Sequence, residues 1–190
     1  MIITREWAMP NKNTFTIKPI KEFIVNNIKE YSKDKNSITI IDPFANNCSI
    51  KDVLEKELPD INIVYISNDL DPSMNTDYNM DALDFLKLMN KKNIKADIIL
   101  HDAPFTVRQV SESYKKLGMS VNMETTQSSF WGNLKKEIAN ISKHNSLVFS
   151  FGYNSGGIGK TKGYEILKIL LTAHGGAHND TISVLEIKNK

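Results

Sequence analysis

The abrupt end of one apolar stretch is the feature that most limits how this chain can fold. Residues 97–101, Asp-Ile-Ile-Leu-His, run directly into Asp102-Ala103-Pro104-Phe105. An apolar run that ends at a turn signal is typical of a central strand in a parallel sheet. Ligands of open α/β sheets bind just beyond the carboxyl ends of such strands. We therefore expect Asp102 and Phe105 to lie at a ligand site.

Strand-like and helix-like segments alternate along the chain. We expect strands over residues 37–41, 61–67, 96–101, 147–151, 164–173 and 181–187, a helix that opens at residues 16–20, and helices over 50–58, 81–89 and 127–143. Residues 1–16 are expected as an extended lead-in, 106–118 as a mobile loop with a helical turn, and 153–162 as a glycine-rich loop. This order predicts a mostly parallel α/β sheet in a single domain over residues 1–190, with helices on both faces and an antiparallel hairpin at one edge.

Composition narrows the class of protein. The chain has 190 residues with 41% hydrophobic and 24% charged residues, which is ordinary for a soluble domain. The net charge of +2 is compatible with a nucleic-acid partner without requiring one. A lone cysteine, Cys48, fits a reducing cytosol, so we expect a cytoplasmic protein. We expect neither a signal peptide nor a membrane span.

Acidic residues follow three successive predicted strands. They are Asp42, Asp69 and Asp102, and Asp81 comes just before a predicted helix. A cofactor rich in hydroxyl and amino groups needs such acceptors, and Asp69 stands where an acid typically holds a ribose diol. Helix capping explains any single one of them equally well. Taken together with the loop at 102–105, the four acids favour a cofactor.

The loop after the first of these strands, residues 42–49, contains no glycine. Glycine usually lets a nucleotide-binding loop approach its ligand closely. Asn46 and Asn47 tolerate left-handed backbone angles best after glycine. The loop is therefore a candidate binding loop that is poorly suited to phosphate.

Four motifs, in this order, resemble those of S-adenosylmethionine-dependent DNA adenine-N6 methyltransferases. They are Asp42-Pro43-Phe44-Ala45, Asn68-Asp69-Leu70-Asp71-Pro72, Asp81-Ala82-Leu83 and Asp102-Ala103-Pro104-Phe105. The chain looks most like the small, phage-type members that lack a separate target-recognition domain. The resemblance runs from about residue 14 to the C-terminus, and it includes Arg108-Gln109 and the more specific segments 151–160 and 174–181.

The resemblance implies a Rossmann-like class I methyltransferase sheet and a role for each motif. Residues 16–19 and the loop 42–48 would surround the methionine end of S-adenosylmethionine, Asp69 would bind its ribose, Leu70 would pack on its adenine, and Asp81 with Ala82 would meet the amino edge of that adenine. The implied cofactor-binding residues are Thr16, Asp42, Phe44, Asn46, Asp69, Leu70, Asp81 and Ala82. The implied catalytic residues are Asp102, Ala103, Pro104 and Phe105.

The chemistry of that loop can be stated from its residues. The amino group of adenine is a poor nucleophile, because its lone pair is delocalised into the ring. The Asp102 carboxylate and a neighbouring backbone carbonyl can accept its two hydrogens and free the lone pair, which is electrostatic catalysis. Phe105 offers a flat surface for a base turned out of the helix.

The loop departs from the family pattern, acid-Pro-Pro-aromatic, at Ala103. The carbonyl at that position is kept, but the rigidity of a proline is lost. We therefore expect a looser loop and a slower enzyme. The alternative is a catalytically weakened relative that binds cofactor or DNA in an anti-restriction or regulatory role. A third hypothesis is an RNA or protein-amide methyltransferase.

Basic residues and a near-motif bear on the partner. Residues 154–161 are similar to a phosphate-binding P-loop, but Asn154 replaces its first glycine. Residues 162–190 are also too few for the strands and the Mg-binding acid that an NTPase places after this loop. We instead expect Lys160 and Lys162 to contact DNA phosphates, with Arg108 as the best single candidate. The basic residues expected near the active edge are Arg5, Lys12, Lys18, Arg108, Lys115, Lys116, Lys160 and Lys162. The lack of a target-recognition domain predicts short or low-specificity recognition, or a homodimer that shares the DNA.

The segment 174–180 carries His174, His178 and Asp180, which could suggest a metal site. The glycines between the histidines instead favour a hairpin turn. We therefore expect no metal.

Overall fold

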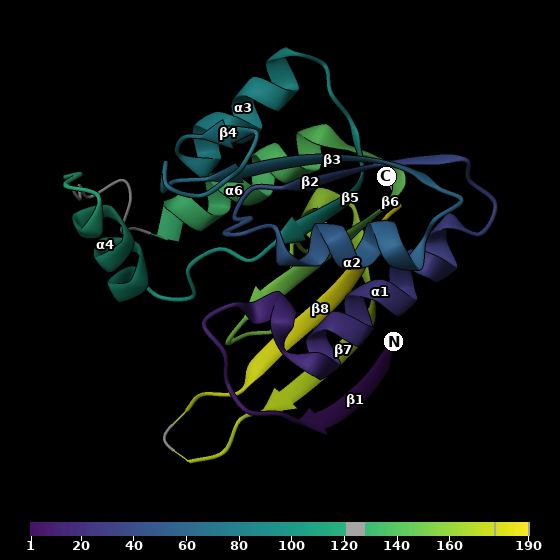
Figure 1. Cartoon of the computed structure of the whole chain (residues 1–190), viewed down its shortest axis with the longest axis horizontal. Coiled ribbons are helices and arrows are strands. Elements are labelled where there is room, and N and C mark those ends of the chain that lie inside the picture. Colours follow the sequence, from purple (N-terminus) through teal and green to yellow (C-terminus); the bar gives the residue numbers. More distant parts are fainter. Residues whose placement is uncertain (121–127, 177, 190) are drawn as a thin grey trace.

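One eight-stranded sheet runs through residues 1–120, 128–176 and 178–189, which are the residues that this computed structural model describes (Figure 1). Its strand order is β1-β7-β8-β6-β5-β2-β3-β4. The strands are β1 (Ile2–Trp7), β2 (Ser37–Asp42), β3 (Asn62–Asp69), β4 (Tyr78–Asn79), β5 (Ala96–His101), β6 (Ser142–Gly152), β7 (Tyr164–Ala173) and β8 (Thr181–Lys188). Every pairing is parallel except the two that β8 makes, with β6 and with β7. The mostly parallel sheet with a C-terminal antiparallel hairpin is confirmed.

The N-terminal segment corrects two expectations. Residues 2–7 are not a mere lead-in, because they form β1, which pairs in parallel with β7. The β7–β8 hairpin therefore lies inside the sheet, and β1 forms the edge. Every residue of β1 is exposed, so the strand carries none of the alternation that marks a half-buried strand in a sequence.

Helices cover both faces of the sheet (Figure 1). The α-helices are α1 (Lys18–Ser32), α2 (Ser49–Glu57), α3 (Ala82–Lys91), α4 (Val107–Lys116) and α6 (Ser128–Ile141), and the 3-10 turns are η1 (Thr14–Thr16) and η2 (Lys160–Lys162). Helices α1 and α2 pack on one face, and α3 and α6 pack on the other, as expected. The expected helix at 127–143 begins within the described residues at Ser128, because Gln127 lies outside them.

The segment 106–118 is a helix rather than a mobile loop. Thr106 and Gln109 form a capping box, in which each side chain binds the backbone N–H of the other residue. Val110 and Tyr114 are buried at helical spacing. The segment is an amphipathic helix, α4, which its mostly polar sequence did not indicate. Its narrow apolar face packs against the end of the sheet.

Two apolar cores anchor these layers. Ile20, Ile24 and Ile28 of α1 have no exposed surface and pack against one face of the sheet. Phe85 of α3 and Leu134 of α6 are equally buried on the opposite face. Full burial of such a side chain contributes about 1.5–3 kcal/mol. No helix in the described part of the chain is both long and apolar enough to cross a bilayer.

The parallel register brings four chain segments to one edge of the sheet. Strands β2, β3, β5 and β6 run in the same direction and end at Asp42, Asp69, His101 and Gly152. The antiparallel β8 begins at this same edge, because Ile182 pairs with Gly152. The loops that follow the parallel strands therefore meet the β7–β8 turn at this edge. Ligands of open α/β sheets bind at this edge, beyond the carboxyl ends of the strands.

Candidate functional site

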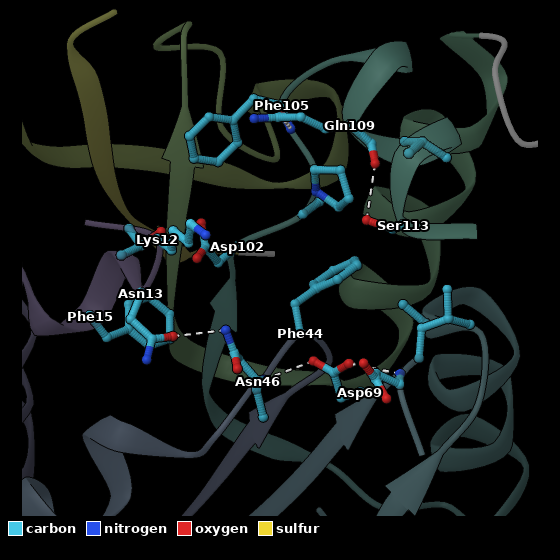
Figure 2. A pocket seen from close by; sticks show the side chains of 18 of the residues that line it. Lys12, Asn13, Phe15, Phe44, Asn46, Asp69, Asp102, Phe105, Gln109 and Ser113 are labelled. Atoms are coloured by element: carbon cyan, nitrogen blue, oxygen red, sulfur yellow. Dashed lines mark hydrogen bonds between the residues drawn. The ribbon is translucent and has the colours of Figure 1, made fainter. Parts of the chain in front are cut away.

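A cavity of about 560 Å³ opens at this edge of the sheet. Most of the expected site residues line it, from separate elements: Phe44, Asn46, Asp69, Leu70, Asp81, Ala82, Asp102, Ala103, Pro104 and Phe105. Figure 2 shows Asp102 and Phe105 facing the same hollow as Phe44 and Asp69. The volume is that of a typical small-molecule site.

Asp102 lies at the end of the central strand β5, and it carries the clearest electrostatic signal in the cavity. Its Oδ1 atom is buried and has no hydrogen-bond partner among the described residues. Burial raises the pKa of Asp102 to about 7, and the Thr14 hydroxyl partly offsets this. A carboxyl group whose pKa lies near neutral pH, and which has an unpaired oxygen, can accept a hydrogen bond from a ligand.

Aromatic rings form the wall beside Asp102. The ring of Phe105 packs edge-on against that of Tyr153, with the centroids 5.0 Å apart. Phe105 also lies against Gly152, where an added Cβ would come within 3.8 Å of its ring. The Phe105 ring is therefore a flat surface that contacts with Tyr153 and Gly152 hold in place.

The loop that carries these groups is tied down by two side chains. The Gln109 Oε1 atom accepts hydrogen bonds from the backbone N–H groups of Phe105 (2.7 Å) and Thr106 (3.2 Å). The Trp131 Nε1–H group donates to the carbonyl of Pro104 at 3.1 Å. The sequence analysis did not identify Trp131, because the contact joins residues 27 positions apart.

The glycine-free loop after β2 adopts the left-handed angles that its asparagines allow. Asn46 has φ +47°, as expected, but Cys48 with φ +54° takes the place of Asn47. The Asn46 N–H donates to Asp69 Oδ2 at 2.8 Å, and the Asn46 amide donates to Asn13 at 2.8 Å. These bonds, drawn in Figure 2, join three separate loops around the cavity.

Asp42 and Thr16 do not line the cavity, although both were expected to contact a cofactor. Asp42 is fully buried beneath the cavity, where its carboxylate accepts from the Tyr65 hydroxyl (2.7 Å) and the Phe44 N–H (3.2 Å). Burial raises its pKa to about 7. Thr16 donates its hydroxyl to the Asn13 carbonyl at 2.8 Å. Both residues shape loops that line the cavity rather than facing it.

Helix α4 closes the other end of the cavity, which the sequence did not indicate. The Tyr114 hydroxyl donates a hydrogen bond to Asp81, whose other oxygen caps α3 by accepting the Leu83 N–H at 2.8 Å. Lys116 forms an ion pair with Asp71 at 3.0 Å. Tyr114 and Lys116 both line the cavity, so α4 is tied to the loops beside Asp69.

The expected DNA-binding cations are not gathered at the cavity. Arg108 lies on α4, is 86% exposed and pairs with Glu112 at 2.7 Å. Lys160 and Lys162 lie at the opposite end of the sheet, because β7 begins directly after them and its Tyr164 pairs with Lys188. The expectation that all basic residues lie near the active edge is wrong for these two lysines, since residues 153–163 carry the chain back across the sheet.

The P-loop-like segment binds the protein's own carboxylate. The backbone N–H groups of Ile158 and Gly159 donate to Glu186 at 2.5 and 3.0 Å, and Glu186 is fully buried. The backbone N–H groups of this turn thus bind an anion. Its anion is a side chain of β8, which argues against a nucleotide phosphate there.

His174 is a structural residue of the hairpin. Its ring nitrogens lie 2.9 Å from the Ala8 carbonyl and 2.9 Å from the Thr181 hydroxyl. Across residues 1–120, 128–176 and 178–189, no group of acidic, histidine or cysteine side chains is arranged to hold a metal ion. The segment 174–180 joins β7 to β8 as the hairpin interpretation predicted, with Ala177 outside the described residues.

No family model and no curated protein matches the chain. Solved structures do match: a protein from Listeria monocytogenes assigned as a class I S-adenosylmethionine-dependent methyltransferase has a TM-score of 0.65 at 13% identity, over 91% of this chain and 60% of its own. SMU.776, assigned as a methyltransferase and complexed with SAH, has a TM-score of 0.58 at 12% identity, over 85% of this chain and 48% of its own. The HI0767 protein of Haemophilus influenzae, assigned as a methylase, has a TM-score of 0.56 at 12% identity, over 88% of this chain and 89% of its own.

The chain thus spans less than two thirds of the length of the first two of these proteins. Similarity at this level of identity is a similarity of fold. The described structure has the α/β fold of class I methyltransferases, with its cavity at the carboxyl ends of the parallel strands.

Proposed function

We propose that this protein transfers a methyl group from S-adenosylmethionine to the N6 amino group of adenine in DNA. The observation that carries the proposal is the Asp102 carboxyl group at the end of β5, with one buried and unpaired oxygen, in a cavity beside an aromatic wall. The similarity to structures assigned as S-adenosylmethionine-dependent methyltransferases supports the choice of donor.

The residues present fit that donor. Asp69 and Asp81 supply carboxylate acceptors for hydroxyl and amino groups, and Leu70 and Phe44 supply apolar walls. Asn46 would hold the loop against the donor, because its side chain and backbone join the loops on both sides. When bound, the sulfonium compound supplies an activated methyl group. Asp42 and Thr16 act one step away, by fixing the loops that contact the donor.

At the target base, the protein would accept hydrogen bonds from the amino group and hold the base in position. The Asp102 carboxylate and the carbonyl of Ala103 would accept the two hydrogens of the adenine amino group, which makes its lone pair available for attack. Phe105 would stack against the base and hold the nitrogen in line with the methyl group. The proton released from the nitrogen would pass to Asp102 or to solvent.

Contact with DNA would use cations around the cavity. Lys12 and Lys116 line it, and Arg108 lies on the exposed side of α4, directly after the catalytic loop. Lys160 and Lys162 would not contact DNA bound there, because they lie at the far end of the sheet.

The test is transfer of labelled methyl groups from S-adenosylmethionine to unmethylated DNA, with the product nucleosides identified by mass spectrometry. We expect N6-methyladenine from the wild type, no transfer from Asp102→Ala, and unchanged transfer from a control variant at an exposed acid, Asp34→Ala. RNA and protein extracts are offered in parallel. Label that enters RNA or protein in place of DNA would contradict the proposal.

Ala103 favours a second candidate, a weakened relative that binds the donor without turnover and acts in an anti-restriction or regulatory role. Calorimetric binding of S-adenosylmethionine by wild type that transfers no label to any substrate would support this candidate over the first.

A further inference from the structure

Side chains from two helices hold the backbone of the loop at residues 102–105. Trp131, in the first turn of α6, donates its indole N–H to the Pro104 carbonyl at 3.1 Å. Gln109 of α4 accepts the N–H groups of Phe105 and Thr106 at 2.7 and 3.2 Å. Figure 2 shows Gln109 beside Phe105 at the rim of the cavity. The first of these ties reaches across from a helix on the face of the sheet, whereas the second is local.

The loop needs such ties because its own residues fix little of its backbone. Pro104 fixes its own φ angle and keeps Ala103 extended. Because residue 103 is not a proline, no ring fixes its φ angle or restricts the backbone of Asp102. The buried oxygen of Asp102 is also unpaired among the described residues, so that side chain does not anchor the loop through it. The direction of the Ala103 carbonyl therefore depends on bonds made further along the loop.

We propose that Trp131 is a positioning residue for this loop. Its N–H fixes the Pro104 carbonyl, and this sets the direction in which the Ala103 carbonyl and the Asp102 carboxylate face the cavity. An indole N–H that is shielded from solvent usually finds one polar partner, and for the half-buried Trp131 that partner is a loop carbonyl rather than a carbonyl of a helix or strand. Buried Ala103 packs in the same apolar cluster as Phe130 and Val110, so α6 and α4 grip the loop from the same side.

The consequence for catalysis rests on the proposed function, but the mechanical role does not. Trp131→Phe keeps an aromatic ring and removes the donor. Loss of one hydrogen bond of this kind should speed amide exchange at Phe105 and Thr106 about fivefold. On the proposed function, kcat should fall by a similar factor, with the KM for the methyl donor unchanged. Trp7→Phe, at an exposed position on β1, is the matched control and should change neither.

A second substitution tests whether the defect is one of loop order. Ala103→Pro should fit, because Pro104 already keeps residue 103 in the extended region that a proline adopts. Added to Trp131→Phe, it should restore most of the lost kcat and slow the exchange at Phe105 and Thr106 again. A defect in core packing alone would not be repaired by a proline in the loop.

The measurements separate failure of this inference from failure of the proposed function. Unchanged exchange at residues 105 and 106 in Trp131→Phe would overturn the inference, whatever the protein methylates. Faster exchange throughout the sheet, or no rescue by Ala103→Pro, would also overturn it, because either result marks a general loss of stability. A wild type that transfers no methyl group would refute the proposed function, while the exchange measurements would still decide the role of Trp131.

Discussion

The ionisation of Asp102 gives the most direct test of the site's chemistry. Only its ionised form can accept a hydrogen from the adenine amino group without itself donating. Burial raises the pKa of Asp102 to about 7, so activity should be lost as the pH falls through neutrality. With that pKa, the Asp102 carboxyl group is ionised in roughly one tenth of the molecules at pH 6 and in about nine tenths at pH 8. We expect kcat/KM, which reports the free enzyme, to rise about tenfold between these two values and then to level off.

The diagnostic perturbation is Thr14→Val. The Thr14 hydroxyl lowers the pKa of Asp102, so its removal should raise that pKa further and move the rise in activity to higher pH. This variant matters because Asp42 is a second buried carboxyl group with a pKa of about 7. A profile that belonged to Asp42 would not move to higher pH in Thr14→Val, because the charge on Asp102 raises the pKa of Asp42 and this variant makes that charge less populated.

The assay is the initial rate of labelled methyl transfer at DNA concentrations below KM, from pH 5.5 to 9. Ionic strength must be held constant, because binding to DNA depends steeply on salt. A flat profile across this range, or a shift of the Thr14→Val profile to lower pH, would refute the reasoning.

Two predictions concern stability. Burial raises the pKa of Asp42 to about 7, above its ordinary value in an unfolded chain. The unfolded chain therefore loses this proton first, and the folded state becomes less stable relative to it as the pH rises toward 7. Asp42→Asn, which removes the charge, should therefore gain roughly 3 kcal/mol of stability relative to wild type in urea unfolding as the pH rises from 5 to 8; a constant difference would contradict this. At Gly157, which has φ +50°, an added Cβ would overlap the Glu186 carboxylate. Gly157→Ala should lower the free energy of unfolding by more than about 2 kcal/mol, whereas Gly132→Ala, in open space on α6, should raise it by about 0.5–1 kcal/mol. Equal effects of the two glycine substitutions would refute the close-contact argument.

The sequence predicted the parts of the site that depend on local pattern. Asp42 and Asp69 end strands and Asp102 directly follows one, as their apolar runs indicated, because strand and turn signals are read within a few residues. The left-handed angle at Asn46 followed from residue type alone. These features carry the fold class and the place of the cavity.

The missed parts depend on contacts between distant segments. The bonds of Tyr114 to Asp81 and of Trp131 to Pro104 span 33 and 27 residues, and no local pattern records them. The same limit explains the misplaced lysines, Lys160 among them, because only the pairing of β7 with β8 shows which end of the sheet they reach.

The edge strand β1 has a consequence for how the protein is made. Ile2 of β1 pairs with Lys168 of β7, so β1 has no partner until β7, far along the chain, has also been synthesised. Its apolar side chains Ile2 and Ile3 are more than half exposed even in the finished sheet. Until β7 is available, β1 is therefore an unpaired strand, which other chains or a chaperone can occupy first.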